Sequence, residues 1–318
     1  MGTAPAERTP PVATPAALHS TKSRRSLAFL AIAALPLTAA LSACGGSADA
    51  SNANNQKPTE LVFAMPPGTE DGELGKETEL VKGYIAEAAG VEVKQETPAD
   101  YLGVVEAVRQ GHVDVALMSP FATSLAVKNG SVDALIVWKS PGDKPASHCY
   151  SSPGSGINTL EDVKGKKVAF VDPGSSTGYF MPKAMFVKAG LEDGKDYQST
   201  FAGGHDSALL ALTNHSVDVA CSSIADRIIE AGAIKASDLQ EIGATDPLPL
   251  GVSIVVNKDL DAETRTKIAN ELATKMSGNK DLTLLGGLTD YVIEPGADVY
   301  QPLYDVAEAA GVNLEDMR

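Results

Sequence analysis

One strand-like motif occurs twice in this chain, about a hundred residues apart. Residues 111–119 read GHVDVALMS and residues 215–223 read HSVDVACSS, and each copy follows a segment with Ala, Val or Leu along one helical face. In both copies a polar turn leads from the helix into a Val-Asp-Val-Ala strand that ends near a serine. A single copy would be an ordinary buried strand, but two copies at this distance predict two similar α/β lobes rather than a solenoid.

Strand-like and helical segments alternate along the rest of the chain. Residues 61–65, 91–96 and 251–257 have the apolar pattern of strands, and residues 77–89 and 100–110 have helical periodicity. This order predicts an α/β fold whose sheets are mainly parallel and flanked by helices. Ligands bind such sheets at the carboxyl ends of the strands, where both repeats carry a hydroxyl, so we expect two lobes facing one cleft.

The lobe boundaries follow from the positions of the prolines. We expect lobe one to comprise residues 59–143 and 249–318, and lobe two to comprise residues 144–248. Prolines gather where the chain passes between the lobes, at 141–145 and 247–249. These two crossings are predicted to form a hinge.

The N-terminus has the features of a bacterial lipoprotein leader. Basic residues precede an uncharged apolar stretch at 27–41, which is short for a membrane span of about 20 residues. Leu-Ser-Ala-Cys follows and resembles the lipobox, so we expect residues 1–43 to be a signal peptide and Cys44 to carry lipid. Residues 44–58 are small and polar and predict a flexible tether. A secreted protein with unmodified Cys44 and a retained membrane anchor are the alternatives.

Composition excludes some partners of the mature chain. Removing residues 1–43 leaves 22 basic and 40 acidic residues and a net charge of −18. Such a surface argues against nucleic acid or anionic lipid as a partner, and any bound anion must be held by a local site. We therefore expect an extracytoplasmic protein that is attached to the cell membrane only through its lipid.

Two cysteines, Cys149 and Cys221, remain after Cys44 is assigned to lipidation. An even number in an oxidising compartment favours a disulfide between them. Two separate buried thiols stay an alternative, because sequence spacing does not show how closely the residues approach.

Three consecutive hydroxyl side chains stand at the start of a predicted helix. They lie in VDPGSSTGYF, residues 171–180, which follows the strand-like residues 166–171. Serine and threonine cap helix N-termini, where free backbone N–H groups and the helix dipole attract anions. A nucleotide-binding loop would add a lysine, so neutral donors at this point fit a small tetrahedral oxyanion better. Simple helix capping is the alternative, and Pro182 predicts a start tighter than a regular α-turn.

This stretch also carries a family resemblance. DPGSSTGYFMP resembles the DPxSTSGxxxP stretch of the phosphonate- and phosphite-binding proteins of ABC transporters. Similar segments occur in the same order at 100–103, 111–121 and 203–220, and they cover most of residues 59–256. The resemblance implies a type II periplasmic-binding-protein fold that closes on its ligand. It also implies a monomer that delivers phosphonate, phosphite or phosphate to an ABC permease.

The resemblance assigns ligand-binding roles residue by residue. Ser175, Ser176 and Thr177 would bind the phosphonyl oxygens from lobe two, and Tyr101 would donate its hydroxyl from lobe one. The family usually has Ser-Thr-Ser where this chain has Ser-Ser-Thr, so the number of hydroxyl donors is the same and the shape of the site differs.

Four further residues are candidates for the site. His205 and Asp206 stand where the family carries residues that face the other side of the ligand. A carboxylate there can accept a hydrogen bond from a protonated oxygen of the anion or pair with the amine of an aminophosphonate. His205 and Asp206 can also simply begin the following helix. Tyr150 falls roughly where the family places another aromatic, and Ser119 ends the first repeated strand and can cap the next helix.

Rival functions remain open in the sequence. The same fold could bind a sulfonate, a thiamine precursor or another small anion, and the lobes could serve a sensory module. A hydrolase using His205 and Asp206 is less favoured, because no metal-spaced ligand or nucleophile stands near them in the sequence. We therefore expect no enzyme activity, no cofactor and no metal, and we assign Trp138 to the core.

Overall fold

The computed structural model describes residues 58–68, 72–282 and 288–312, all of which belong to one compact unit, Ala50–Arg318. The predicted signal peptide, the predicted lipidation site Cys44 and most of the predicted tether lie outside the described residues. Among the residues that are described, no helix is long and apolar enough to cross a membrane.

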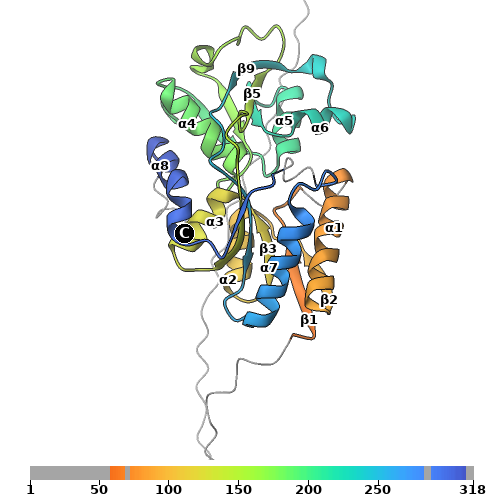
Figure 1. Ribbon diagram of the computed structural model, residues 1–318. Coiled ribbons are helices and arrows are strands. Elements are labelled where there is room, and N and C mark those ends of the chain that lie inside the picture. Colours follow the sequence, from red (N-terminus) through yellow and green to blue (C-terminus); the bar gives the residue numbers. More distant parts are fainter. Residues whose placement is uncertain (1–57, 69–71, 283–287, 313–318) are drawn as a thin grey trace, which may run out of the picture. The chain divides into compact units, whose positions relative to one another are not determined.

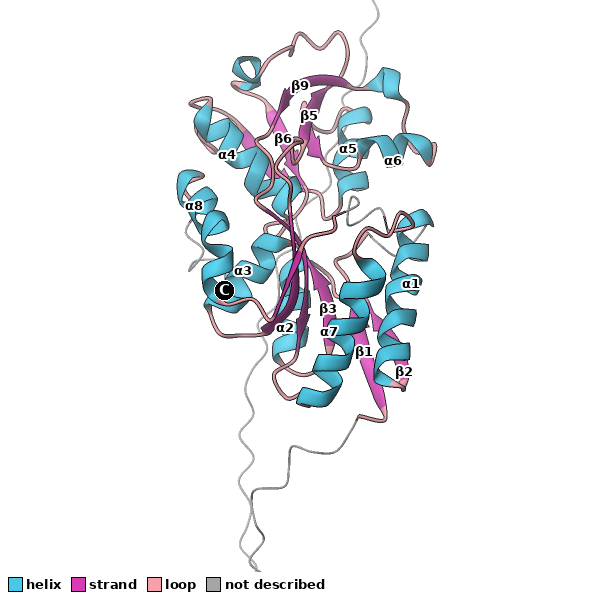
Figure 2. Cartoon of the chain, in the orientation of Figure 1, coloured by secondary structure: helices cyan, strands magenta, loops and turns pink. Residues whose placement is uncertain are grey.

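Two separate mixed sheets organise the chain (Figures 1 and 2). The six-stranded sheet consists, in spatial order, of β11 (Tyr291–Ile293), β4 (Asp133–Lys139), β10 (Leu250–Val256), β3 (Val115–Met118), β1 (Glu60–Ala64) and β2 (Glu92–Glu96). The five-stranded sheet consists of β7 (Gln198–Phe201), β6 (Lys167–Phe170), β8 (Val219–Ser222), β5 (His148–Ser151) and β9 (Gln240–Ala244). The strands of each sheet come from the residues predicted for one lobe, so we refer to the elements of these sheets as lobe one and lobe two.

The expectation of mainly parallel sheets is corrected by the strand pairing. In lobe one β1 is parallel to β2 and β3, whereas β10 is antiparallel to β3 and β4, and β11 is antiparallel to β4. In lobe two β6 is parallel to β7 and β8, whereas β5 is antiparallel to β8 and β9. The physical reason is the hinge. Strands β5 and β10 each enter their sheet directly from a crossing between the lobes, so each runs away from the crossing. The neighbouring strands β8 and β4 end on the side of the crossings and therefore run in the opposite direction.

The twin motif occupies the same place in both sheets. Strand β3 lies beside β1, and strand β8 lies beside β6. The aspartate before each of these strands accepts a hydrogen bond from a backbone N–H of the neighbouring strand. Asp114 accepts the Val62 N–H at 2.7 Å, and Asp218 accepts the Lys167 N–H at 2.8 Å. The prediction of two similar lobes therefore agrees with the strand order and with the side-chain contacts of the repeat.

Helices pack on both sheets (Figure 2). Their bounds are α1 (Gly72–Ala89), α2 (Tyr101–Arg109), α3 (Pro120–Lys128), α4 (Met181–Lys188), α5 (His205–Thr213), α6 (Ala225–Glu230), α7 (Ala262–Met276) and α8 (Gln301–Ala309). Short 3₁₀ turns are η1 (Leu160–Val163), η3 (Ala236–Asp238) and η5 (Ala297–Tyr300). Local signals explain the starts: Asp100 caps α2 through the Gly103 N–H, and Asp261 caps α7 through the Thr264 N–H.

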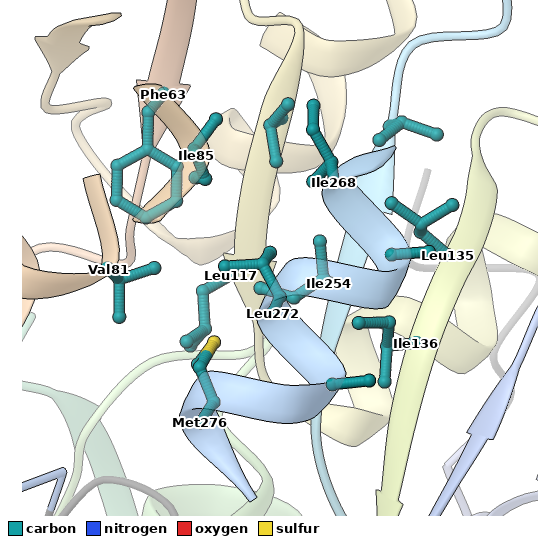
Figure 3. Close-up of a cluster of buried hydrophobic side chains, with 14 of the residues drawn as sticks. Phe63, Val81, Ile85, Leu117, Leu135, Ile136, Ile254, Ile268, Leu272 and Met276 are labelled. Carbon is teal, nitrogen blue, oxygen red and sulfur yellow. The ribbon is translucent and has the colours of Figure 1, made fainter. Parts of the chain in front are cut away.

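The core of lobe one lies between its sheet and the neighbouring helices α1 and α7 (Figures 1 and 3). Figure 3 shows Ile85 from α1 and Leu272 from α7 gathered with the strand residues Phe63 and Ile254, all of them fully buried. Trp138 is fully buried as well, and its indole N–H donates to Ser277 Oγ at 2.9 Å. Its assignment to the core is therefore confirmed.

The two crossings of the hinge are hydrogen-bonded to one another. The Ser147 N–H donates to Thr245 Oγ1 at 3.0 Å, the Thr245 N–H donates to the Ser147 carbonyl at 2.9 Å, and the Ala146 N–H donates to the Asp246 carbonyl at 3.2 Å. The hinge is thus a paired ribbon rather than two independent linkers.

A disulfide joins Cys149 of β5 to Cys221 of β8. The two residues are direct partners in the antiparallel pairing of these strands, and both are fully buried. The structure therefore pairs the two cysteines that the sequence leaves after Cys44.

Candidate functional site

The candidate site forms where strands of both lobes end. Ser119 follows β3, the turn with three hydroxyls follows β6, and Ser222 ends β8. Helices α2, α3 and α5 begin at the same region, because each follows the carboxyl end of a strand. The sequence rule that ligands of α/β sheets bind at these ends thus identifies one location in the three-dimensional structure.

The three hydroxyls belong to a π-helical turn, η2 (Ser176–Phe180), which precedes α4. Ser175 caps it, since its Oγ accepts the Gly178 N–H at 3.0 Å. The expectation of a turn tighter than an α-helix is wrong, because the Phe180 N–H bonds to the Ser175 carbonyl across five residues. Pro182 supplies the reason: it has no N–H for the Gly178 carbonyl, which instead accepts the Val171 N–H at 3.0 Å.

Glycine is required at the centre of this turn. A Cβ on Gly178 would lie 2.2 Å from Val171 Cγ2 and 2.9 Å from Ser175 Oγ. The end of β6 can therefore approach the helix start only because residue 178 has no side chain.

Hydrogen bonds connect lobe one to the hydroxyl turn and to the loop that precedes it. The Phe121 N–H donates to Ser176 Oγ at 3.0 Å, Ser119 Oγ donates to the Gly174 carbonyl at 2.7 Å, and the Tyr101 N–H donates to Asp172 Oδ2 at 3.4 Å. The Ser176 hydroxyl accepts in its contact, so its own hydrogen remains able to donate to an anion. The Ser119 hydroxyl already donates to Gly174 and accepts the Ala122 N–H, which makes it a bridge between the lobes.

Tyr101 and Asp172 form the centre of this contact. Burial raises the pKa of the Tyr101 hydroxyl to about 12, a hydrogen bond with Ser175 lowers it in part, and Asp172 and Asp206 raise it. The phenol therefore stays protonated and remains a neutral donor. Burial also raises the pKa of Asp172, whose carboxylate accepts the Gly174 N–H at 2.7 Å and orders the loop before the turn.

A second network surrounds Thr177. Its hydroxyl lies 2.9 Å from Ser223 Oγ and 3.4 Å from His205 Nε2, while His205 Nδ1 lies 3.1 Å from Ser222 Oγ. Burial lowers the pKa of His205 to about 4, with Asp206 acting in the opposite direction, so the ring is neutral at physiological pH. The structure thus brings Thr177 and His205 together with both serines of the second repeat.

Asp206 and Tyr150 lie at the margin of this group. Asp206 is exposed in the first turn of α5, and its charge acts on Tyr101, which places an acid near the donors. Tyr150 packs against the same apolar cluster as Tyr101. Burial raises the pKa of the Tyr150 hydroxyl to about 12, with smaller effects of Glu241 and Asp226, so it too remains protonated.

Three contributors were not assigned a role from the sequence. Asp172 stands just before the three hydroxyls, and nothing in its local sequence pattern shows that it meets Tyr101 of the other lobe. Ser222 and Ser223 carried a usable signal, because they end the second copy of the repeated motif. Among the described residues, no group of three or more His, Cys, Asp or Glu could hold a metal ion.

The donors that converge here are uncharged. They are hydroxyls of Ser176, Thr177 and Tyr101 together with backbone N–H groups at helix starts, and the exposed carboxylate of Asp206 acts on Tyr101. Dipoles of this kind bind a compact anion reversibly and distribute its charge over several short hydrogen bonds. The arrangement suits recognition of an oxyanion with at least one oxygen that can donate a proton to a carboxylate.

Comparison with known families identifies the group to which this architecture belongs. Residues 63–298 match the family described as "ABC transporter, phosphonate, periplasmic substrate-binding protein". The chain belongs to this family. Membership agrees with the resemblance drawn from the hydroxyl turn and indicates a location outside the cytoplasm.

Two characterised relatives carry transport names. The chain is 30% identical over 260 residues to the "Phosphate-import protein PhnD" of Mycolicibacterium smegmatis, which covers 77% of this chain and 81% of that protein. It is 28% identical over 187 residues to the "Phosphonates-binding periplasmic protein" of Escherichia coli, over 56% of this chain and 55% of that protein. Both names describe transport or binding rather than catalysis.

Solved structures confirm the predicted fold class. PhnD1 from Prochlorococcus marinus in complex with methylphosphonate superposes with a TM-score of 0.68 at 15% identity, over 80% of this chain and 98% of that chain. A binding protein of a phosphonate ABC transporter from Pseudomonas aeruginosa gives 0.67 at 22% identity, over 80% and 87% of the chains. The alkanesulfonate-binding protein SsuA from Xanthomonas axonopodis bound to MOPS gives 0.59 at 16% identity, over 81% and 95%.

Proposed function

We propose that this protein captures a small phosphorus oxyanion (phosphonate, phosphite or phosphate) between its two lobes and delivers it to an ABC permease. The observation that carries the proposal is the convergence of neutral donors from both lobes on the hydroxyl turn. Ser176 and Thr177 supply hydroxyls from lobe two, and Tyr101 supplies one from lobe one. Family membership supports the transport role, and the names of the relatives support a phosphorus ligand.

Asp206 would distinguish phosphorus oxyanions from sulfur oxyanions. A phosphonate, phosphate or phosphite can keep a proton near neutral pH and donate it to a carboxylate, whereas a sulfonate has no proton to offer. An unprotonated anion would meet the Asp206 charge without a compensating hydrogen bond, which is unfavourable. Asp206 could also pair with the amine of an aminophosphonate.

Catalysis is a weaker interpretation of the same residues. A general base works best with a pKa near the operating pH, and the pKa of His205 is about 4. Its hydroxyl neighbour Ser222 is almost fully buried and so is not presented to a substrate. These properties support a role for His205 in holding Thr177 rather than in activating a nucleophile.

The proposed location of the protein completes this function. A lipid on Cys44, joined through the tether at 44–58, would hold a monomer at the membrane surface next to its permease. Mass spectrometry of the mature N-terminus tests this part: a diacylated or triacylated cysteine is expected, and an unmodified Cys44 would contradict it.

Isothermal titration calorimetry tests the ligand. We expect binding of at least one of methylphosphonate, 2-aminoethylphosphonate, phosphite and phosphate, and no comparable binding of methanesulfonate or sulfate. Asp206→Asn should reduce the difference in affinity between phosphate and sulfate, because it removes the carboxylate charge. Preferential binding of the sulfur compounds to the unmodified protein would contradict the proposed ligand class, and multiple turnover of a phosphate ester would contradict the binding role.

A further inference from the structure

The second copy of the repeated motif buries a serine where the first copy has an apolar residue. When the two copies are aligned on their Val-Asp-Val-Ala segments, Met118 at the end of β3 corresponds to Ser222 at the end of β8. Each of these side chains is only 1% exposed. A buried hydroxyl is unfavourable unless it is hydrogen-bonded, so the contacts of Ser222 indicate what it contributes.

Two contacts account for the hydroxyl of Ser222. Its Oγ accepts the Ile224 N–H at 3.2 Å and lies 3.1 Å from Nδ1 of His205. The buried hydroxyl hydrogen also needs an acceptor, and among the described residues Nδ1 of His205 is the one within reach. Ser222 therefore donates to Nδ1, which must then be the ring nitrogen without a hydrogen.

This assignment places the ring hydrogen of His205 on Nε2. The ring is neutral, since burial lowers its pKa to about 4. Nε2 lies 3.4 Å from Thr177 Oγ1, so the ring donates in this contact and Thr177 accepts. The exposed Ser223 hydroxyl, 2.9 Å from the same oxygen, can donate to it as well. Thr177 then accepts two hydrogen bonds, and its own hydrogen is left for the anion.

We propose that Ser222 and His205 are positioning residues, which orient the Thr177 hydroxyl toward the phosphorus oxyanion without touching the anion themselves. This inference rests on the proposed function. The hydrogen bonds run in one direction, from the Ile224 N–H through Ser222, His205 and Thr177 to the anion, and we call them the donor chain. The backbone N–H fixes this direction at the start, because it can only donate. Hydrogen bonds aligned in this way strengthen one another.

The opposite ring tautomer would reverse the behaviour of Thr177. With its hydrogen on Nδ1, His205 would present a lone pair at Nε2 and accept the Thr177 hydrogen. Thr177 would then present only lone pairs to an anion, which repel it. The buried Ser222 hydrogen would also lose its acceptor, which is costly. The position of one hydrogen on the ring thus decides whether Thr177 attracts or repels the ligand.

NMR of the ring nitrogens tests the first part of the donor chain. Long-range proton–nitrogen spectra of the isotope-labelled protein distinguish a ring nitrogen that carries a hydrogen from one that does not, and comparison with His205→Gln identifies the His205 signals. We expect the hydrogen on Nε2 at neutral pH, with and without methylphosphonate. In Ser222→Ala the Nδ1 signal should change, because this nitrogen loses its donor. A hydrogen on Nδ1 in the unmodified protein would overturn the proposal.

A double-mutant cycle tests the second part. Calorimetry with methylphosphonate compares Ser222→Ala, Thr177→Val and the double variant. Thr177→Val keeps the shape of the side chain and removes the donor, so the affinity should fall about tenfold or more. Ser222→Ala should weaken binding about threefold to tenfold, because a fraction of the molecules then holds the ring in the wrong tautomer or orientation.

The coupling of the two substitutions distinguishes positioning from a merely structural role. In the Thr177→Val background, Ser222→Ala should have no further effect on the affinity, because Ser222 acts through the hydroxyl that is already absent. Additive losses would overturn the proposal, since Ser222 would then affect binding by another route. An unchanged affinity of Ser222→Ala would overturn it as well.

Ser151→Ala is a matched control in the same sheet. The Ser151 hydroxyl is fully buried in β5 and donates to the Ile157 carbonyl at 2.7 Å. This variant loses a buried strand hydroxyl, as Ser222→Ala does, but leaves the donor chain complete. Its affinity for methylphosphonate and its His205 spectrum should therefore be unchanged. Thermal unfolding of every variant establishes that it is folded before its binding is interpreted.

Failure of the proposed function and failure of this inference give different results. If the unmodified protein binds none of phosphate, phosphite and methylphosphonate, the proposed function fails, and the ring spectra alone decide about the donor chain. A hydrogen on Nε2 together with an Nδ1 signal that depends on Ser222 then supports the chain, and a hydrogen on Nδ1 overturns it. If the unmodified protein binds methylphosphonate and the cycle is additive, the proposed function stands and the positioning role is overturned.

Discussion

Replacing Ser176 by alanine should weaken binding of a phosphorus oxyanion far more than it changes the stability of the protein. The side chain is 2% exposed and would make two kinds of contact in the proposed ligand complex. Its oxygen accepts the Phe121 N–H at 3.0 Å, and its hydrogen is free to donate to the anion. The substitution removes both contacts and leaves a buried backbone N–H without its acceptor.

The magnitude follows from these two losses. A hydrogen bond to a charged group contributes about 1.5 to 3 kcal/mol, and a buried donor left unsatisfied costs about 1 to 3 kcal/mol. Together they predict a loss of about 2.5 to 6 kcal/mol, which corresponds to about two to four orders of magnitude in the dissociation constant. The open form tolerates the change, since water can replace Ser176 at the Phe121 N–H.

Calorimetry with methylphosphonate, together with thermal unfolding of the ligand-free protein, measures both quantities. Ser151→Ala is the matched control, because its hydroxyl is fully buried in lobe two and donates to the Ile157 carbonyl at 2.7 Å, at the end of β5 away from the crossing. We expect the control to lose stability and keep its affinity. An affinity of Ser176→Ala within threefold of the unmodified protein would show that this hydroxyl does not bind the ligand.

Three other perturbations test the surroundings of the site. Gly178→Ala places a Cβ 2.2 Å from Val171 Cγ2. It should therefore lower the unfolding free energy by about 1 to 3 kcal/mol and abolish ligand binding in calorimetry. Unchanged binding would show that the close approach of β6 to the turn is not required. Replacing Cys149 and Cys221 by alanine opens a covalent loop with a sequence separation of 72 residues. The free energy of unfolding measured with denaturant should then fall by about 4 kcal/mol, and a decrease of less than about 1 kcal/mol would contradict this value. The pKa of His205 is lowered to about 4 in the folded protein, so the unfolded chain binds the additional proton between about pH 6.5 and 4. The free energy of unfolding should therefore fall by up to about 3 kcal/mol as the pH decreases through this range. If the unfolding free energy of a His205→Gln variant depended on pH in the same way, His205 would not be the group responsible.

Much of the fold follows from local signals in the sequence. The repeated Val-Asp-Val-Ala motif predicts two similar lobes because its aspartate, its strand and its serine recur with the same spacing. Helix α2 was predicted at 100–110 and occurs at Tyr101–Arg109, because its cap at Asp100 and its buried face of Val104 and Val108 are encoded within one short segment.

Strand direction was not predictable by the same means. Periodicity identifies a strand, as it does at 251–257, but it does not say from which end the strand enters its sheet. The antiparallel direction of β5 and β10 therefore does not follow from the sequence. Their direction depends on the crossings, which are a property of the whole chain. The same limit applies to Asp172, whose contact with Tyr101 spans 71 residues and two lobes.

The hydroxyl turn shows where local reasoning reaches its limit. Pro182 correctly indicated an irregular helix start, yet the direction of the irregularity depended on a distant partner. Pro182 has no N–H, so the Gly178 carbonyl could accept a hydrogen bond either from a nearer residue of a tighter helical turn or from a residue outside the helix. The structure has the second arrangement, because the Gly178 carbonyl accepts the Val171 N–H directly after β6. Tertiary contact therefore decides between two local alternatives that the sequence leaves equal.

The charge of the protein explains why its site must be built from dipoles. With a net charge of −18 over residues 44–318, the long-range field repels every anion that approaches. That repulsion is screened within about 8 Å at physiological ionic strength, whereas hydrogen bonds from helix starts act at contact distance. The starts of α3 and η2 meet at Phe121 and Ser176, so their partial positive charges repel one another in the closed form unless an anion lies near them. Closure without a ligand is then less favourable than closure around one, which is the property that a transporter needs in order to distinguish a loaded binding protein from an empty one.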